Sequence, residues 1–297
     1  MKHIPKKRFG QNFLTDRAII NSLIEAISPQ AEDQMVEIGP GLGAMTQPLL
    51  ARLKHLHVVE LDRDIVAWMQ NHYPAEKITI HNVDALKFDF GSLMESVENS
   101  GLIAQRQENA NKAIRTARQE TDLEVSLAST PGFQRIRVVG NLPYNISTPI
   151  LFHLLENVDA IIDMHFMLQK EVVERMVAAP STPAYGRLSV MLQYRLQMEY
   201  LLTVPPEAFD PPPKVESAFV RAVPYAKLPY PAADETLFAN VVQAAFGQRR
   251  KTLRNTLKGL LDDAGFATLG LDSKLRAENL PVSTFIEIAN YLSRQSA

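Results

Sequence analysis

The stretch that decides the fold is Val36–Gly43, with the sequence VEIGPGLG, where an apolar strand runs directly into a glycine turn. Glycines let the backbone turn sharply and let a ligand lie against the main chain. A dinucleotide fingerprint places its third glycine one residue later, so this spacing favours a nucleoside cofactor without a pyrophosphate. We therefore expect Gly39 and Gly41 to contact a cofactor, with an ordinary loop as the alternative.

Apolar strands alternate with helical stretches around this turn. Residues 17–29 predict a helix with Asp16 as its N-cap, and another helix is expected from about Ala44. Such alternation predicts an α/β fold, a Rossmann-like and mostly parallel sheet with helices on both faces. The predicted strands are Met35–Ile38, His57–Leu61, Ile78–His81, Ile136–Val139 and Ile161–Leu168, followed by a closing hairpin of Tyr200–Val204 and Val215–Val223.

Two departures from the alternation indicate how the chain is divided. Residues 91–134 are polar and rich in Gln, Asn, Glu and Arg, which predicts an exposed, partly helical insertion. Beyond about Ala226 the strand pattern stops, and prolines at 224, 229 and 231 indicate a linker. We expect a Rossmann-like domain over 1–226 and a small helical domain over 227–297.

The composition excludes several classes of protein. The chain of 297 residues is 46% apolar and 22% charged, has a net charge of −2 and contains no cysteine, which rules out disulfides and cysteine-ligated zinc. No apolar run approaches the roughly 18 residues of a membrane span, and the basic N-terminus lacks the apolar core of a signal peptide. We expect a cytoplasmic, monomeric protein without a metal or a membrane partner, whose nucleic-acid surface, if any, comes from local charge clusters.

The ends of the next two strands carry candidate cofactor ligands. Glu60 ends the second strand, where a carboxylate can accept hydrogen bonds from ribose hydroxyls. Asp84 follows the third strand, where it can accept from an adenine amino group. Each alone also fits a solvated loop carboxylate. With the glycine turn they mark the carboxyl ends of three successive strands, the edge where ligands bind in open α/β sheets.

The fourth strand ends in the most specific motif of the chain, Asn141-Leu142-Pro143-Tyr144. An aromatic amine such as that of adenine is a poor nucleophile because its lone pair is delocalised into the ring. The Asn141 side-chain oxygen and the Leu142 carbonyl can accept the two amino hydrogens and direct the lone pair at a methyl donor. Pro143 stiffens the backbone, and Tyr144 can stack on a flipped-out base. The alternative is a plain strand-to-loop turn.

A second aromatic candidate, Phe209, precedes the triple proline at 211–213. Consecutive prolines cannot form a helix and hold a stiff extended loop. We assign Phe209 to the acceptor site, as the second face of an aromatic sandwich around adenine. A core phenylalanine ahead of a strand is the alternative.

Basic side chains gather in the C-terminal part, where no acidic residue occurs between Glu235 and Asp262. Arg250, Arg254 and Lys258 recur at intervals of four beside an apolar stripe, which predicts a basic helix face. Because no glutamates are interleaved, we favour contact with RNA phosphates over a solvated face. The candidate RNA-binding residues are Lys6, Lys7, Arg8, Arg187, Arg249, Arg250, Arg254 and Lys258.

Taken together, these motifs resemble those of the ribosomal RNA adenine dimethyltransferases, most closely the bacterial small-subunit branch associated with kasugamycin sensitivity. The matching segments are Lys7–Leu14, Glu37–Gly43, Glu60–Asp62, Asp84–Ala85, Asn141–Ile146, Tyr185–Val190, Pro211–Phe219 and Leu275–Leu280. The insertion at 91–134 is longer than the family pattern leads us to expect.

The resemblance implies S-adenosylmethionine as the cofactor and the 6-amino groups of adenines as the acceptors. It further implies dimethylation of a pair of adjacent adenines near the 3′ end of 16S ribosomal RNA in the small subunit, with a role in small-subunit biogenesis. In that family the residues matching Asn12 and Leu14 help hold the cofactor, and Asn141 lies beside its methyl group.

Alternatives with the same motifs stay open. A large-subunit ribosomal RNA adenine methyltransferase of the antibiotic-resistance type shares the cofactor and the acceptor chemistry, although Tyr185–Val190 and Leu275–Leu280 favour the small-subunit branch. The chain also fits a ribosome assembly factor in which methylation is secondary. A transcription-associated binding module on a methyltransferase scaffold that has lost catalysis is the third option, and the intact Asn141, Tyr144 and Glu60 argue against it.

Overall fold

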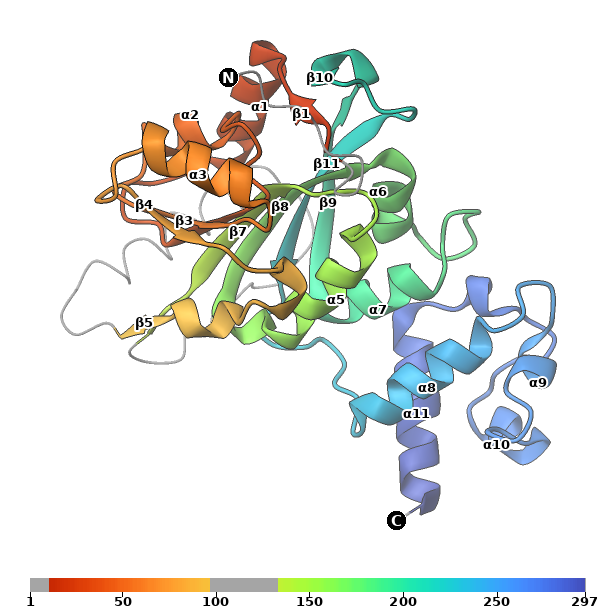
Figure 1. Cartoon of the computed structure of the whole chain (residues 1–297). Coiled ribbons are helices and arrows are strands. Elements are labelled where there is room, and N and C mark those ends of the chain that lie inside the picture. Colours follow the sequence, from red (N-terminus) through yellow and green to blue (C-terminus); the bar gives the residue numbers. More distant parts are fainter. Residues whose placement is uncertain (1–10, 97–132, 297) are drawn as a thin grey trace. The chain divides into compact units, whose positions relative to one another are not determined.

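Figure 1 shows the protein as a computed structural model, which describes residues 11–96 and 133–296. The chain forms two compact units, each with its own apolar core. The first unit contains the chain up to Lys170 and Leu201–Lys227, and the second contains Glu171–Tyr200 and the chain from Leu228 onward.

This grouping differs from the expected division after residue 226. The break falls after Lys227, and Glu171–Tyr200 joins the C-terminal helices. The physical reason is burial: Val190 and Tyr194 pack in the same core as Phe238 and Phe285. The segment therefore stabilises the helical unit although it lies between two strands in the sequence.

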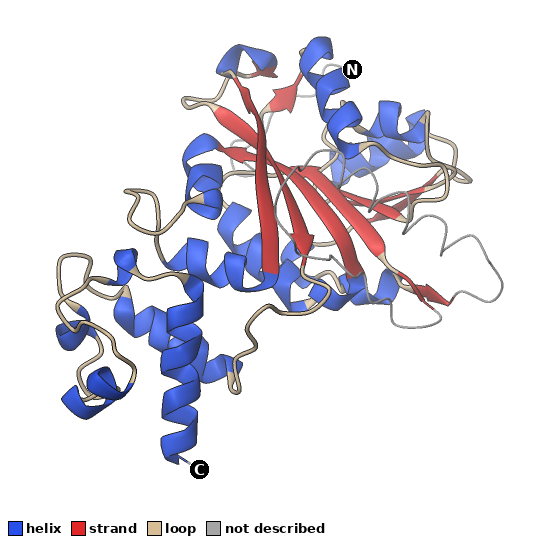
Figure 2. Ribbon diagram, turned by 180° about the vertical axis from the view of Figure 1, so that it is seen from behind, coloured by secondary structure: helices blue, strands red, loops and turns tan. Residues whose placement is uncertain are grey.

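The sheet confirms the predicted α/β architecture, and helices cover both of its faces (Figure 2). Its order is β4-β3-β2-β7-β8-β11-β9. The pairs from β4 through β8 are parallel, and β11 runs antiparallel to β8. The strands are β2 (Met35–Ile38), β3 (Leu56–Val59), β4 (Ile78–His81), β7 (Ile136–Asn141), β8 (Ile161–Gln169), β9 (Leu196–Val204) and β11 (Ser217–Pro224).

Three helices pack on one face of the sheet. Asp16 caps the first of them by accepting hydrogen bonds from the main-chain N–H groups of Ala18 and Ile19, as predicted. Leu23, Ile24 and Ile27 on its apolar side are buried in the core of the first unit. These helices are α1 (Arg17–Ile27), α2 (Thr46–Leu50) and α3 (Arg63–His72), and α5 (Ser147–Glu156) lies on the opposite face.

Short elements complete the first unit. The strands β1 (Phe13–Leu14) and β10 (Phe209–Asp210) pair with each other. The strands β5 (Glu95–Ser96) and β6 (Phe133–Gln134) pair at the two ends of the expected insertion, of which residues 97–132 lie outside the described residues. The single-turn helices are η2 (Ala85–Lys87), η3 (Phe90–Leu93), η4 (Val158–Ala160) and η5 (Pro206–Ala208).

The second unit is helical, and its basic segment is not the continuous helix that the sequence predicted. Helix α8 (Glu235–Ala245) ends before Gly247, the chain turns, and the short α9 (Leu253–Thr256) follows. Glycine disfavours the interior of a helix, so Gly247 favours the end of α8 at this point. The remaining elements are α6 (Lys170–Val177), α7 (Arg187–Arg195), α10 (Asp263–Thr268), η6 (Ala277–Asn279) and α11 (Val282–Ser296).

Within 11–96 and 133–296 no helix is both long and apolar enough to cross a membrane.

The Arg137 side chain on β7 joins several elements of the first unit through ion pairs and hydrogen bonds. The Arg137 guanidinium donates two hydrogen bonds of 2.9 Å to Asp163 and one of 2.7 Å to Asp33. It also donates to the carbonyl oxygen of Ile27 at 2.6 Å, which attaches the end of α1 to β7 and β8.

Candidate active site

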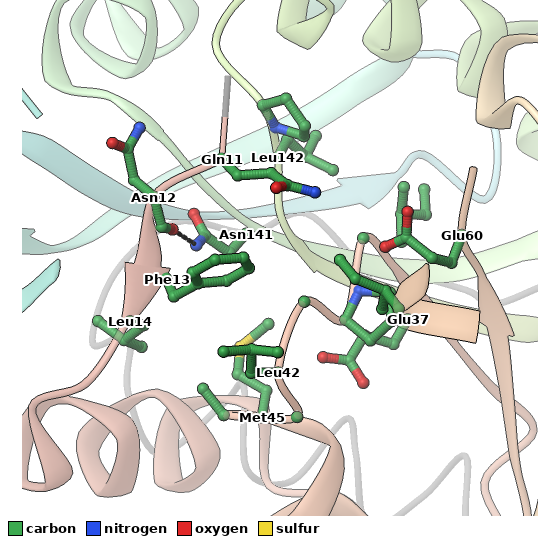
Figure 3. A pocket seen from close by; sticks show the side chains of 18 of the residues that line it. Gln11, Asn12, Phe13, Leu14, Glu37, Leu42, Met45, Glu60, Asn141 and Leu142 are labelled. Atoms are coloured by element: carbon green, nitrogen blue, oxygen red, sulfur yellow. Dashed lines mark hydrogen bonds between the residues drawn. The ribbon is translucent and has the colours of Figure 1, made fainter. Parts of the chain in front are cut away.

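A cavity of about 970 Å³ opens at the carboxyl ends of β2, β3 and β7. Its wall combines the glycine turn, the strand ends at Glu60 and Asp84, and the Asn141 motif with the N-terminal segment Gln11–Thr15. Figure 3 shows Glu60 and Asn141 projecting from different strands toward the same space. The volume lies at the upper end of the range for small-molecule sites. The cavity thus lies at the carboxyl ends of the parallel strands, the sheet edge that the sequence analysis predicted for a ligand.

The glycine turn needs glycine at each of its three positions. Gly39, Gly41 and Gly43 have φ angles of +66°, +54° and +82°, the left-handed region that other residues avoid. A Cβ at Gly41 would lie 2.9 Å from the Phe13 ring, and one at Gly43 would lie 2.2 Å from the Tyr73 hydroxyl. Side chains therefore pack closely against the turn on one side, and its glycines line the cavity.

Two carboxylates at the strand ends are held in fixed orientations. Glu60 is 8% exposed and lines the cavity, and its Oε1 accepts a hydrogen bond of 2.7 Å from the Asp62 N–H. Asp84 lines the cavity and accepts from the Leu86 N–H at 3.0 Å. Asn82 donates to the carbonyl oxygen of Glu60 at 2.8 Å, which joins the two strand ends. Both carboxylates therefore line the cavity in defined positions.

A third carboxyl, Glu37, was not selected from the sequence. It is 1% exposed, lines the cavity, and accepts a hydrogen bond of 2.6 Å from Thr46 Oγ1. Burial raises its pKa to about 7, opposed by the Thr46 hydrogen bond and assisted by the charge of Glu60. The signal in the sequence is a lone glutamate inside the apolar strand Met35–Ile38, because glutamates are rarely fully buried unless they are paired.

The Asn141 motif lies where β7 ends. In the pairing of β2 with β7, Ile38 is opposite Gly140, so Asn141 follows beside the glycine turn. Asn141 Nδ2 donates to the Asn12 carbonyl oxygen at 3.0 Å, the bond drawn in Figure 3. The Leu142 side chain is buried, and its N–H donates to the Met167 carbonyl of β8 at 3.1 Å. All four residues of the motif line the cavity.

Tyr144 is fixed at both ends. Its carbonyl oxygen accepts a hydrogen bond of 2.9 Å from the Ser147 hydroxyl, and its own hydroxyl is 2.6 Å from Ser217 Oγ. Ser217 is fully buried and is the first residue of β11. Burial raises the pKa of Tyr144, against the Ser217 hydrogen bond, which keeps the phenol neutral. Sequence reasoning missed Ser217, because nothing in the sequence places it next to a residue 73 positions away.

Phe209 does not line the cavity, which corrects its assignment to the acceptor site. It is 4% exposed and packs in the core of the first unit, opposite Leu14 in the β1–β10 pair. The alternative named for it, a core phenylalanine, describes this position. Asn12 and Leu14 do line the cavity, and so does Gln11, whose amide donates to Asp62 at 3.3 Å.

The candidate RNA-binding residues fall into two groups. Lys6, Lys7 and Arg8 lie outside the described residues. The others are exposed in the second unit: Arg187 begins α7 and is not part of the cavity wall, and Arg254 forms an ion pair of 2.6 Å with Asp263. Arg249 donates to the Pro183 carbonyl at 3.1 Å. The remaining basic residues of the set, Arg250 and Lys258, are exposed on either side of α9.

The lining of the cavity fits a nucleoside cofactor. In the part of the chain that the structure describes, no group of three or more histidine or carboxylate side chains is arranged to hold a metal ion. The cradle of positive-φ glycines and the buried carboxylates along the wall match a ligand with a ribose and a cationic group. The residues present therefore fit a nucleoside-based methyl donor.

Strand order, glycine turn and the Asn-Leu-Pro-Tyr strand end define a Rossmann-like methyltransferase. The sequence pattern of the family described as "Ribosomal RNA adenine dimethylase" matches residues 2–294. The chain belongs to this family.

Named relatives agree with this membership. "Ribosomal RNA small subunit methyltransferase A" of Methylobacillus flagellatus is 68% identical over 99% of this chain and all of its own length. The protein of the same name from Thiobacillus denitrificans is 55% identical over 98% of this chain and 99% of its own.

Two solved structures share the fold at 19% identity. A dimethyladenosine transferase from Plasmodium falciparum has a TM-score of 0.67, covering 96% of this chain and 98% of its own. The 23S rRNA methyltransferase ErmE has a TM-score of 0.64, covering 95% of this chain and all of its own. Both solved structures thus share the fold of this chain.

The first testable consequence concerns Glu37. Its folded-state pKa of about 7 exceeds the ordinary 4.5, so the folded protein binds more protons than the unfolded chain between these values. Wild-type stability is therefore lost as the pH rises through this window. The free energy of unfolding of Glu37→Gln, relative to wild type, should increase by roughly 3 kcal/mol across it. Denaturant unfolding followed by the fluorescence of Trp68, the single tryptophan, measures this difference.

Glu25→Gln, at an exposed position on α1, is the matched control for loss of a carboxylate and should not reproduce this pH dependence. A difference between Glu37→Gln and wild type that stays constant with pH would contradict the assigned ionisation.

The second consequence concerns the Tyr144–Ser217 pair. Tyr144→Phe leaves the buried Ser217 hydroxyl without its partner and should cost about 1–3 kcal/mol of unfolding free energy. Adding Ser217→Ala should recover most of that loss, because replacing both partners by apolar groups is nearly neutral. The same unfolding assay applies. Additive losses in the double variant would show that the hydroxyls do not act as a pair.

Proposed function

We propose that this chain transfers methyl groups from S-adenosylmethionine to the 6-amino groups of adenines in small-subunit ribosomal RNA. The observation that carries the proposal is the single cavity wall shared by the glycine turn, Glu60 and the Asn141 motif. A cofactor bound against the first two has its reactive end beside the third. Membership in the adenine dimethylase family supports the same reaction.

The cofactor-holding residues follow from their positions. The main chain at Gly39 and Gly41 lies open to a ligand, Glu60 accepts from ribose hydroxyls, and Asp84 accepts from the adenine amino group. Asn12 and Leu14 close the cavity from the N-terminal segment. When bound, the cofactor supplies a methyl group on a cationic sulfur, which makes the methyl an electrophile.

The acceptor residues orient the target amine. Asn141 Oδ1 and the Leu142 carbonyl accept its two hydrogens, so the nitrogen lone pair turns out of the ring plane and toward the methyl group. Pro143 keeps the loop stiff and Tyr144 stacks on the flipped base. The cofactor that the glycine turn and Glu60 would hold would supply the methyl group to this nitrogen, and the amine would afterwards lose its extra proton to water. No residue is needed as a base before attack.

The proposed target within the small subunit is a pair of adenines in its ribosomal RNA. The names of the close relatives support the small subunit, and the family resemblance supports 16S ribosomal RNA with a pair of adjacent adenines near its 3′ end, each dimethylated. The exposed basic residues of the second unit, Arg187, Arg249, Arg250, Arg254 and Lys258, would contact phosphates. A monomeric, cytoplasmic protein that acts during small-subunit biogenesis fits this role.

An assembly role is compatible with this chemistry and is the second candidate. The exposed cations of the second unit can bind a ribosomal subunit whether or not methyl transfer occurs. The two functions separate experimentally, because a variant of the acceptor motif removes only the chemistry. The next two predictions use that separation.

Asn141→Ala should lower the single-turnover rate of methyl transfer about 10²–10³-fold, the usual cost of losing one preorganised polar group. The assay uses labelled S-adenosylmethionine and small subunits that lack dimethyladenosine, followed by mapping of the modified base. Subunit affinity should stay near wild type. Glu60→Ala is the contrasting variant, since it should weaken cofactor binding by about 1–3 kcal/mol in calorimetry. Near-wild-type methylation by Asn141→Ala would reduce the motif to a structural turn.

Charge reversal of Arg250 and Lys258 together should weaken binding to small subunits and flatten its salt dependence. Each lost phosphate contact lowers the slope of log K against log salt by about 0.9, so the double variant should lose about 2. Arg254 is a poorer probe because Asp263 already neutralises it. A matched pair, Lys77→Glu with Lys227→Glu, changes the net charge equally at exposed positions of the first unit. Equal effects of the two pairs would refute a specific RNA surface.

A further inference from the structure

The two ends of the Asn141 amide have different surroundings. Its nitrogen lies 3.0 Å from the main-chain oxygen of Asn12 (Figure 3). A carbonyl oxygen can only accept a hydrogen bond, so the end of the amide that faces Asn12 must be the NH₂ group. The Oδ1 end is turned away from Asn12, and within residues 11–96 and 133–296 it accepts no hydrogen bond from a protein group.

This orientation matters because an amide presents opposite chemistry at its two ends. A primary aromatic amine carries two donor hydrogens. Of the two ends of the Asn141 amide, only the oxygen end can accept one of them. A flipped amide would direct donors at donors, which repels the substrate and removes the acceptor. The choice between the two orientations is worth a whole hydrogen bond at the reacting nitrogen.

The Asn12 carbonyl is itself held in place from both sides along the chain. On one side, the Gln11 amide donates to Asp62 beside the cofactor wall. On the other, Phe13–Leu14 pairs with Phe209–Asp210, and the Phe13 ring packs against Gly41. The Thr15 N–H then donates to the Ala208 carbonyl at 2.8 Å. A carbonyl anchored in this way cannot follow the amide if the amide rotates.

We propose that the main-chain carbonyl of Asn12 is a positioning group for methyl transfer, which fixes the Asn141 amide so that only its oxygen faces the target amine. The inference rests on the proposed function, since it assigns how the acceptor residue of that reaction is oriented. It makes the N-terminal segment Gln11–Thr15 a link between the cofactor wall and the acceptor site. Within that segment Gln11 contacts Asp62 and Phe13 contacts the glycine turn, both on the cofactor side of the cavity. Asn12, which lies between them, contacts Asn141.

Asn141→Asp tests this orientation, because it keeps the shape and replaces the NH₂ donor by oxygen. Protonated, the carboxyl can donate its O–H to the Asn12 carbonyl and still offer an oxygen to the amine. Ionised, it has no proton for Asn12, and the two oxygens repel each other at hydrogen-bond distance. The single-turnover rate of the variant, divided by that of wild type, should fall as the pH rises from about 5.5 to about 8.5. Above the pKa of the new carboxyl the fall should be about tenfold per pH unit.

Taking the ratio removes titrations that both proteins share, such as those of Glu37 and Tyr144, which line the same cavity in each. The Glu60 and Asp84 side chains line it in both proteins as well. Asn145→Asp is the matched control, because it adds a carboxyl to the same cavity wall at an exposed position four residues further along the chain. Its rate ratio should not fall with pH in this way, whatever its level.

The outcomes separate this inference from the function on which it rests. A ratio that falls with pH for Asn141→Asp, but not for the control, supports the positioning role of Asn12. A ratio that stays flat, rises, or falls equally in the control overturns it. In each of these cases the rate of Asn141→Ala decides the proposed function independently, since a large loss there retains Asn141 as the acceptor.

Discussion

The parallel pairing of β2 with β7 is the constraint on which the site depends. Its register sets Ile38 opposite Gly140, so the glycine turn and the Asn141 motif leave the sheet side by side. A Cβ at Gly140 would lie 2.7 Å from the Ile38 carbonyl oxygen, so only glycine allows the two strand ends to approach this closely. The cofactor wall and the acceptor motif are neighbours because two backbones touch there.

Charge is divided between the cavity and the exposed surface. Three carboxyls, Glu37, Glu60 and Asp84, line the cavity, whereas the basic residues of the second unit are exposed. An acidic wall attracts a cationic methyl donor and disfavours phosphate, while exposed cations do the reverse. In a chain with a net charge of −2, acidic groups thus line the cavity and basic groups lie on the surface of the second unit, as the proposed methyl donor and RNA would require.

The N-terminal segment shows how a short strand can organise a site. The pair of β1 with β10 places Leu14 and Phe209 in the core, and the residues just before Leu14 are thereby brought over the cavity. Phe209 thus contributes through packing and main-chain pairing. The Pro-rich loop after it leads to Ser217, whose hydroxyl meets Tyr144. The acceptor side chains are accordingly held by residues from the beginning and the later part of the first unit.

The sequence by itself determined the α/β class, the strand sites and the sheet edge that carries the cavity, because apolar periodicity and the glycine turn are local signals. Only the tertiary structure decided what depends on distant pairing or on burial. Phe209 is buried in the core, and burial raises the pKa of Glu37. The Ser217 hydroxyl forms a hydrogen bond with the Tyr144 hydroxyl. The basic segment broke into a turn and a short helix, and Glu171–Tyr200 joined the second core. A single sequence records which residues prefer a strand or a helix, but burial and hydrogen-bond partners arise from neighbours that the fold brings together.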